Sequence, residues 1–229
     1  HSRACGRIQN FPPMTRRLLT NTRVLVIGGA GFMGSNFIHH LFAEVPSIYV
    51  TNLDALTYAG NLANLNGVPR SRYSFVQGDL CDTPLLVRLM RGVDFVVNFA
   101  AESHVDRSIH EGVDDFVRTN IVGVHSLLKA IACSKKVRCA IHISTDEVWG
   151  DLPLTSKKRF EEASAFQPNS PYAASKAAGD LLIRSYTKTY GVPVIVTHAT
   201  NNFGPRQYPE KLIPFFISCA LEGSPLPLY

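Results

Sequence analysis

The sequence predicts an α/β fold in which helices cover both faces of a doubly wound parallel sheet. Six short runs rich in β-branched and aromatic residues are predicted strands, and longer stretches with helical periodicity separate them. Most of these runs are continuously apolar, which is typical of parallel strands buried on both faces. A glycine-rich turn directly follows the first run. The alternation predicts right-handed βαβ crossovers.

The elements follow in a regular order. Strands are predicted at residues 23–27, 48–53, 73–77, 94–99, 139–144 and 194–199. Helices are predicted near residues 33–45, 83–91, 114–134, 172–190 and 212–222. The helix near 172–190 has the clearest ends, because Ser170 can cap it, Pro171 suits its first turn and Gly191 follows its last residue.

Charge and composition exclude several classes of protein. The chain has 229 residues, of which 45% are hydrophobic, and no apolar run reaches the roughly 20 residues of a membrane span. Five of the 23 Lys and Arg precede the first acidic residue, Glu44, which leaves 18 to balance the 18 Asp and Glu. The pI of about 9.0 is therefore an effect of the tail, and neither nucleic acid nor membrane is an expected partner.

The cysteines and histidines give no sign of a metal site. The five cysteines are odd in number and none forms a CxxC pair, which favours free thiols in a reducing cytoplasm. The histidines lack metal-ligand spacing, so no metal is predicted.

The turn after the first strand predicts a dinucleotide site. Gly28, Gly31 and Gly34 allow a tight turn and a close approach of the backbone to a pyrophosphate at a helix N-terminus. Such a motif is weak alone, but here it has the required strand–turn–helix context. Asp54 ends the second strand, where a carboxylate accepts hydrogen bonds from the adenosine ribose and favours NAD over NADP. Asp79 follows the third strand, and a carboxylate at that strand end could reach the adenine amino group. The alternative for both acids is a turn or capping role.

These features divide the chain into three parts. Residues 21–200 are predicted to form the NAD-binding Rossmann domain, and residues 201–229 part of a smaller substrate-binding region. Residues 1–20 are interpreted as a tail or extension, with a transit peptide as the alternative for the Arg-bearing, acid-free start.

A tyrosine and a lysine one helical turn apart are candidate catalytic residues. Tyr172 and Lys176 lie on the same helix face. A phenol with a pKa of about 10 is a poor base at neutral pH, but an ammonium and a positive nicotinamide ring both favour phenolate. Such a base takes a hydroxyl proton as hydride leaves the same carbon. The alternative is a solvated helix face with an incidental pair.

Two adjacent acids follow the fifth strand. Asp146 and Glu147 come after Thr145, at a strand end where ligands bind in such sheets. Two carboxylates in one closed pocket are expected to separate in pKa, so that one acts as acid and the other as base. The alternative is a surface turn with solvated acids.

Six segments together resemble the dTDP-glucose 4,6-dehydratases of the extended short-chain dehydrogenase/reductase group. The resemblance covers about residues 22–228, and the Thr-Asp-Glu segment is its most specific part. The segments read GGAGFMGSNF, LDALTYAGNL, FAAESHVDRSI, STDEVWGD, SPYAASKAAGD and TNNFGPRQYPEKLIP.

The resemblance implies a three-stage reaction on dTDP-glucose. Tyr172, helped by Lys176, removes the 4-hydroxyl proton while hydride passes from C4 to NAD, and Thr145 bonds the 4-oxygen. Glu147 then takes the C5 proton while Asp146 protonates the departing 6-hydroxyl, and hydride returns to C6. Elimination of water needs an acid and a base together, which accounts for the acidic pair.

The resemblance also implies the binding residues. The cofactor site would include Phe32, Met33, Asp54, Ala55, Leu56, Thr57, Asp79, Leu80, Phe99, Ala100, Ala101, Glu102, Ser103, Thr119, Tyr172, Lys176 and Asn202. The nucleotide sugar would contact Ser103, Thr145, Asn201, Lys211 and Leu212. A homodimer through the helices at 114–134 and 172–190 is implied as well.

Departures from the family pattern leave alternatives open. Ile27 stands where Thr is usual, and Trp149 and Phe203 replace Tyr. Family members continue into most of a sugar-nucleotide domain, so this chain by itself is expected to have little or no turnover. A 4-epimerase, or an inactive NAD-binding fragment, is the alternative function.

Overall fold

The computed structural model describes residues 21–45, 47–110, 112–153 and 155–227, so the predicted tail over residues 1–20 lies outside the described part. Its centre is a parallel sheet with the strand order β3-β2-β1-β4-β5-β6, as in doubly wound dinucleotide-binding domains. Each predicted strand lies within one residue of its observed bounds. The strands are β1(Arg23–Ile27), β2(Tyr49–Asp54), β3(Tyr73–Gln77), β4(Phe95–Asn98), β5(Cys139–Thr145) and β6(Val194–Ala199).

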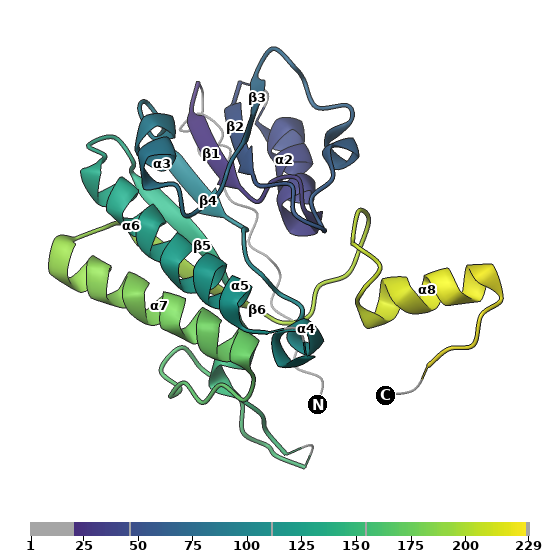
Figure 1. Cartoon of the computed structure of the whole chain (residues 1–229). Helices are drawn as coiled ribbons and strands as arrows, with labels where there is room; N and C mark the ends of the chain where they lie inside the picture. The colour runs from purple at the N-terminus through teal and green to yellow at the C-terminus, as the bar shows by residue number, and fades with distance from the viewer. Residues whose placement is uncertain (1–20, 46, 111, 154, 228–229) are drawn as a thin grey trace, which may run out of the picture.

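Helices cover both faces of the sheet (Figure 1). Helix α2(Phe32–Glu44) packs on one face, and α3(Thr83–Leu89), α6(Val124–Cys133) and α7(Pro171–Tyr190) pack on the other. In β1, Val24 and Val26 join Ile38 of α2 in one buried cluster, while Leu25 and Ile27 belong to the opposite cluster. Alternate residues of β1 are thus buried in two hydrophobic cores on opposite faces of the sheet. For this reason the strand is continuously apolar and does not alternate between apolar and polar residues.

The ends of α7 are set by the residues that the sequence indicates. The Ser170 hydroxyl accepts a hydrogen bond from the Ala173 amide at 3.0 Å, and Pro171 occupies the first turn. Gly191 ends the helix in the left-handed region at φ 66°, which favours glycine. This capping fixes the register of the helix that carries Tyr172 and Lys176.

The prediction of one continuous helix over residues 114–134 is wrong. This stretch is divided into α5(Asp114–Val117), a π-helical segment η2(Arg118–Gly123) and α6. Apolar periodicity runs through all three, so the sequence pattern gives no sign of the wider turn. Three short elements were also not predicted: η1(Leu62–Leu65), α4(Val105–His110) and η3(Asp146–Trp149).

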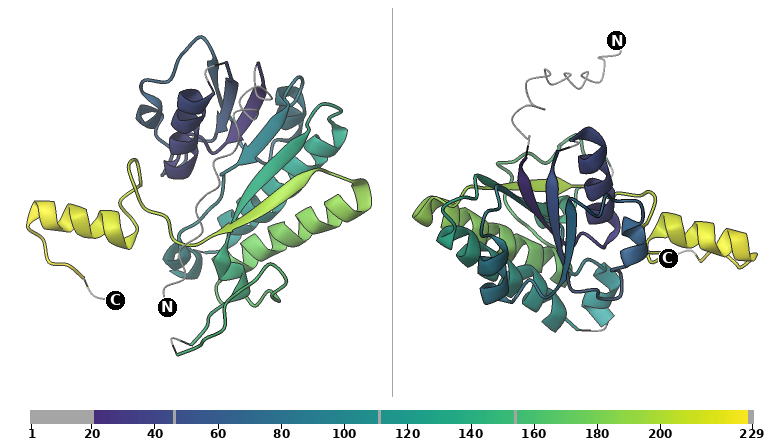
Figure 2. Two further views of the ribbon diagram at one scale, coloured as in Figure 1. Left: turned by 180° about the vertical axis from the view of Figure 1, so that it is seen from behind. Right: turned by 90° about the horizontal axis from the view of Figure 1, so that it is seen from above.

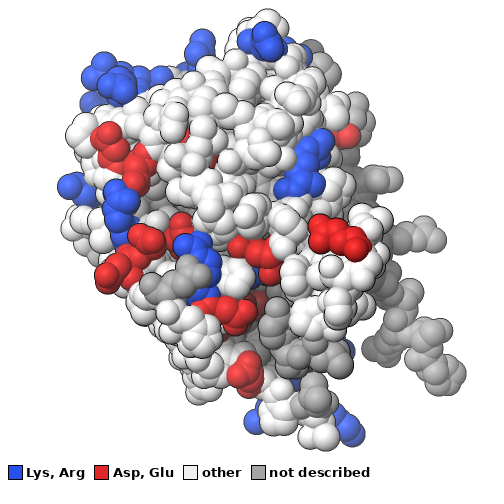
Figure 3. Space-filling model, turned by 45° about the vertical axis from the view of Figure 1, so that its right-hand side comes forward, with Lys and Arg blue, Asp and Glu red and all other residues white. Residues whose placement is uncertain are grey.

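After β6 the chain leaves the sheet and forms α8(Leu212–Glu222), which stands apart from the sheet in the ribbon views of Figures 1 and 2. Basic and acidic side chains are interspersed on the face shown in Figure 3, with no broad field of one sign. Among the described helices, none is both long and apolar enough for a membrane span.

Candidate active site

Two adjoining cavities open at the carboxyl ends of the strands. The first, of about 490 Å³, lies between the glycine turn, the end of β5, the start of α7 and the segment after β6. The second, of about 390 Å³, lies over the ends of β2 and β3. Both are lined by Gly28, Gly31, Phe99 and Ala101, which follow β1 and β4. The strand order reverses between β1 and β4, which is where ligands bind in sheets of this kind.

The glycine-rich turn over residues 28–34, called the glycine turn below, uses its glycines for two different purposes. A Cβ at Gly28 (φ 77°) would lie 2.5 Å from the Ala100 amide nitrogen, and one at Gly34 would collide with the Gly28 carbonyl oxygen. At Gly31, by contrast, the nearest atom would be 3.5 Å away. Gly28 and Gly34 therefore permit backbone packing, whereas Gly31 leaves open the space that both cavities share.

The start of α2 offers a place for an anion. Gly31 caps this helix without a side-chain hydrogen bond, and its first turn holds no acidic residue. The next residues, Phe32, Met33 and Gly34, line the first cavity. Free N–H groups and the positive end of the helix dipole favour negative charge at such a position, so these residues fit a dinucleotide diphosphate.

Asp54 braces the glycine turn and faces the second cavity. Its Oδ2 accepts a hydrogen bond from the Ala30 amide at 2.8 Å, and its Oδ1 accepts one from the Leu56 amide at 2.8 Å. Leu56 is held at φ 54°, which is unusual for a branched side chain and is compatible with this bond. The ribose contact of Asp54 stays a prediction.

Asp79 is paired with a residue that the sequence did not indicate. Its Oδ1 accepts a bond from the Cys81 amide at 2.7 Å, and its Oδ2 lies 2.7 Å from the Arg118 guanidinium. Both Asp79 and Arg118 line the second cavity. The acid therefore has two partners already, and an adenine contact stays a prediction.

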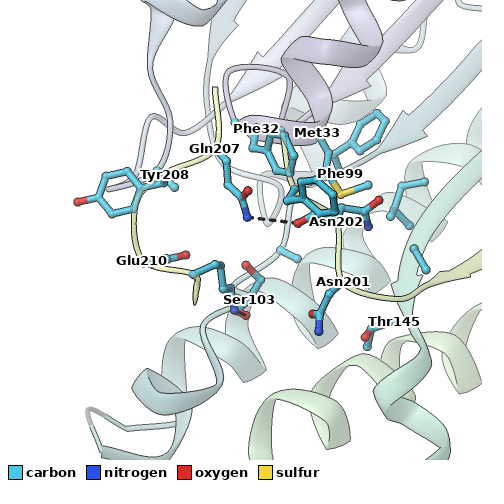
Figure 4. A pocket seen from close by; sticks show the side chains of 18 of the residues that line it. Phe32, Met33, Phe99, Ser103, Thr145, Asn201, Asn202, Gln207, Tyr208 and Glu210 are labelled. Atoms are coloured by element: carbon cyan, nitrogen blue, oxygen red, sulfur yellow. Dashed lines mark hydrogen bonds between the residues drawn. The ribbon is translucent and has the colours of Figure 1, made fainter. Parts of the chain in front are cut away.

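The structure gathers most of the remaining predicted binding residues around the two cavities. Those at the first cavity are Lys211, Leu212 and three residues labelled in Figure 4, namely Ser103, Asn201 and Asn202. Those at the second are Ala55, Thr57, Leu80, Ala100, Glu102 and Thr119. Of all the predicted site residues, Leu56 and Asp146 line neither cavity.

Four of the candidate catalytic residues line the first cavity together: Thr145, Glu147, Tyr172 and Lys176. Thr145 caps η3 by accepting a hydrogen bond from the Glu147 amide at 3.3 Å. The Thr145 side chain also hydrogen-bonds Tyr172. A strand end and a helix start thus bring one hydroxyl, one phenol and one carboxyl to the same space.

The electrostatics of the tyrosine differ from the expectation. Burial raises the pKa of Tyr172 to about 12, and nearby Glu147 adds to this, while the hydrogen bond with Thr145 opposes it. The Lys176 ammonium donates to the Ile143 carbonyl oxygen at 2.7 Å, and its expected effect on the phenol stays a prediction. The residues of the chain alone therefore keep the phenol protonated, and a bound cationic ring is left as the group that favours phenolate.

The acidic pair is divided by its surroundings. Burial raises the pKa of Glu147, Lys211 opposes this, and the Asp146 carboxylate adds to it. Asp146 lies outside the cavity, where its Oδ1 is 3.4 Å from the Thr145 hydroxyl. A carboxylate whose pKa is raised is a stronger base once it is ionised.

Sequence reasoning missed the segment over residues 203–210 as part of the site. It is tied to α2, because the Arg206 guanidinium donates to Asn36 Oδ1 at 2.7 Å and Asn36 Nδ2 donates to the Pro205 carbonyl at 2.9 Å. Gln207 Nε2 donates to the Asn202 carbonyl at 3.3 Å (Figure 4). Glycine and prolines in this segment predict a loop but do not show what it contacts.

Asn120, in the π-helical segment, was also missed. Its Nδ2 donates to the Glu102 carbonyl at 3.0 Å and to Ser175 Oγ at 2.9 Å, while its Oδ1 accepts from the Glu102 amide at 3.1 Å. The buried amide thereby fixes the loop after β4 against α7. A π-helical turn at a functional site is a recurrent arrangement.

Replacing Asn120 by alanine is expected to lower the free energy of unfolding by about 3 kcal/mol, because buried backbone groups of Glu102 lose their partners. Urea unfolding followed by circular dichroism measures the change. The exposed Asn66→Ala variant is the matched control and should differ from the wild type by less than about 0.5 kcal/mol. Equal effects of the two substitutions would contradict the role given to Asn120.

A buried histidine predicts a loss of stability in acid. Burial lowers the pKa of His142 well below 6.5, and Lys176 and His198 add to this. Since the unfolded chain takes up a proton on this ring near pH 6.5 and the folded chain does not, the stability is present above that pH and falls below it. Urea unfolding from pH 8 to pH 5 should therefore show a steeper loss for the wild type than for His142→Gln; parallel curves would reject this origin.

Comparison with known proteins gives a consistent result. The sequence model of a family described as GDP-mannose 4,6 dehydratase matches residues 25–229. The dTDP-glucose 4,6-dehydratase of Xanthomonas campestris (strain B100) is 51% identical over 218 residues, covering 90% of this chain and 60% of the relative. The enzyme of the same name from Salmonella typhimurium is 46% identical over 225 residues, covering 90% of this chain and 62% of its own length.

Solved structures agree with the sequence relatives. The dTDP-glucose 4,6-dehydratase of Streptomyces venezuelae, crystallised with NAD, superposes with a TM-score of 0.86 at 50% identity over 91% of this chain and 65% of its own. A UDP-glucuronic acid 4-epimerase of Bacillus cereus, in complex with its substrate and NAD, gives 0.83 at 28% identity, covering 91% of this chain and 66% of its own. The chain spans about three fifths of the length of the curated relatives.

Proposed function

Because the chain belongs to the dTDP-glucose 4,6-dehydratase family, we propose that it binds NAD and takes part in removing water from dTDP-glucose to give a 4-keto-6-deoxy sugar. One observation carries this proposal: a single cavity is lined by the glycine turn, by Tyr172 and Lys176, and by the acid Glu147. Oxidation alone needs a base, whereas elimination of water also needs groups that move protons at a second carbon.

The cofactor in this proposal is NAD. When bound, it accepts a hydride from the sugar and later returns it, so that no net oxidation results. The N-terminus of α2 would hold the diphosphate, and Asp54 would accept hydrogen bonds from the adenosine ribose. The same carboxylate would repel a 2′-phosphate, which favours NAD over NADP.

The proposed catalytic roles are those that the family resemblance implies, and the cavity lining supports them for Thr145, Glu147 and Tyr172. Tyr172 takes the proton of the 4-hydroxyl, and Thr145, which bonds the phenol, holds the 4-oxygen. Glu147, with its raised pKa, takes the C5 proton. Asp146 would protonate the departing 6-hydroxyl, for which its side chain must turn from Thr145 into the cavity. The balance is one water lost, with the C4 hydride transferred to C6 and the proton on Glu147 returned to C5.

Incubation with dTDP-glucose and NAD tests the proposal. We expect slow formation of a product that is lighter than the substrate by one water and absorbs in strong alkali, as 4-keto sugars do. The rate is expected to be low because the chain spans about three fifths of its relatives' length and so offers the substrate fewer positioning contacts. A parallel incubation with UDP-glucose measures the preference for the base. Formation of a 4-epimer of unchanged mass would instead favour the alternative function of a 4-epimerase. That alternative has less support, because the chain is 28% identical to a 4-epimerase and 51% identical to a dehydratase.

We further propose a homodimer that forms through the helices at residues 114–134 and 172–190. Support comes from apolar side chains exposed on these helices, namely Val117, Val122 and Leu181. Sedimentation at working concentration tests this, and a monomer would contradict it.

We also propose that the protein is located in a reducing cytoplasm. The described cysteines are free, which fits this location.

A further inference from the structure

Asp180 is a buried acid that none of the roles above uses. It lies one turn after Lys176 on α7, and the two residues are only 5% and 3% exposed. Its Oδ2 accepts hydrogen bonds from Ser144 Oγ at 2.8 Å and from His198 Nε2 at 3.0 Å. Its Oδ1 is buried without a hydrogen-bond partner among the described residues. A carboxylate in such a place is costly unless an opposite charge compensates it.

On one side, Asp180 contacts an aromatic cluster through His198. The His198 ring packs against Trp149, with ring centroids 4.6 Å apart, and Trp149 stacks on Phe160 at 5.8 Å. Ser144, which bonds the acid from the other side, lines the first cavity. Asp180 therefore connects the aromatic cluster, through His198, with the lining of the candidate active site, through Ser144.

Lys176 is the cation nearest to this acid along the helix, and its own surroundings do not favour a charge. Its ammonium donates to the Ile143 carbonyl oxygen and lies 3.4 Å from His142 Nε2. Burial disfavours the ammonium, and Asp180 is the acid that opposes this effect. The titratable groups around the pair are His142 from β5, His198 from β6, Asp146 and Glu147 from η3, and Tyr172 from α7 itself.

We propose that Asp180, held by His198 and Ser144, is the positioning residue that keeps Lys176 protonated at neutral pH. The inference rests on the proposed function in one respect, since Lys176 lines the proposed active-site cavity together with Tyr172 and the glycine-rich turn. A neutral amine at this place would lose its attraction for electron-rich ribose oxygens and for a phenolate. The acid thus acts on the reaction through the lysine without touching substrate or cofactor.

A direct titration of Lys176 tests the inference. In protein carrying lysine labelled with ¹³C at Cε, nuclear magnetic resonance follows each lysine with pH, and Lys176→Met assigns the signal. The wild-type midpoint is expected at about pH 8. Asp180→Asn preserves the shape of the side chain and is expected to lower this midpoint by roughly one to three units, the usual effect of one nearby opposite charge.

The exposed Asp114→Asn variant removes the same charge elsewhere and should leave the midpoint unchanged. An unmoved midpoint in Asp180→Asn would overturn the inference. Should Asp180→Asn fail to fold, the Lys176 titration of the wild type still tests the inference. A wild-type midpoint below pH 7 would show that the buried acid does not keep Lys176 charged at neutral pH.

Calorimetric titration with NAD across the same pH range separates this inference from the proposed function. The affinity of the wild type is expected to fall as pH rises through the Lys176 midpoint, and in Asp180→Asn the fall should begin at lower pH. If the wild type binds no NAD, the proposed function fails while the nuclear magnetic resonance titration still judges Asp180. Normal NAD binding with an unmoved lysine midpoint overturns only the inference about Asp180.

Discussion

Alanine at position 34 is expected to weaken NAD binding and to destabilise the fold, whereas alanine at position 31 is expected to weaken NAD binding alone. At Gly34 the new methyl group would collide with backbone atoms of Gly28 and Gly29, neither of which can rotate away. The turn between β1 and α2 must then shift, which costs about 3 kcal/mol in the free energy of unfolding.

At Gly31 the methyl group meets only the Gly28 carbonyl oxygen, at an ordinary 3.5 Å, and the residue has φ −76°, which alanine adopts freely. Its methyl group instead occupies the space shared by the two cavities. Contacts between a diphosphate and the α2 N-terminus would be lost. We expect NAD affinity to fall about 10- to 100-fold, since charge-assisted hydrogen bonds contribute ~1.5–3 kcal/mol.

Calorimetric titration with NAD and urea unfolding, applied to both variants, separate the two effects. The variants are matched controls for each other, because each adds one methyl group to the same turn three residues apart. Unchanged NAD affinity in Gly31→Ala would show that the diphosphate does not lie against this turn. A loss of stability in Gly31→Ala equal to that of Gly34→Ala would show that the space at Gly31 is needed for packing.

Those parts of the fold that depend on local chemistry were predictable from the sequence. Val24 to Ile27 alternate between two cores, so the strand shows itself as a continuous apolar run. Ser170 and Gly191 mark the ends of α7 because capping is a property of one or two residues. The fold class followed from such signals, since alternating strands and helices leave few topologies open.

Long-range polar contacts could not be predicted in this way. The π-helical turn at Asn120 depends on bonds to Glu102, 18 residues away, and to Ser175, 55 residues away. The network of Asp180 joins residues from α7, β5 and β6 that no periodicity connects. The raised pKa of Tyr172 likewise arises from burial, which the spacing of a tyrosine and a lysine does not report.

The candidate site shows the same division. The glycine turn and the Tyr172–Lys176 pair are encoded by spacing within one element, and the structure brings both to one cavity. Asp146 and Glu147 are neighbours in sequence, yet only Glu147 lines the cavity, while the Asp146 carboxylate lies 3.4 Å from the Thr145 hydroxyl. Sequence adjacency therefore identified the acidic pair but did not indicate which acid faces the ligand space.

Replacing Glu147 by glutamine is expected to stop the proposed reaction after its first stage. The amide retains the size of the side chain and cannot take a proton from C5, so formation of the deoxy sugar should fall by about 10²- to 10⁴-fold. Tyr172 and Lys176 remain, so oxidation at C4 should continue. Oxidised sugar with its 6-hydroxyl intact then accumulates.

Quenching the reaction with borodeuteride and analysing the sugars by mass spectrometry distinguishes the stages. The wild type should give a 6-deoxyhexose labelled at C4, Glu147→Gln an intact hexose labelled at C4, and Tyr172→Phe no labelled sugar. Lys158→Gln, at an exposed position remote from both cavities, is the control and should behave as the wild type. If Glu147→Gln forms the deoxy sugar at the wild-type rate, the base at C5 is another residue, because an amide at position 147 has no basic oxygen to offer at this pH.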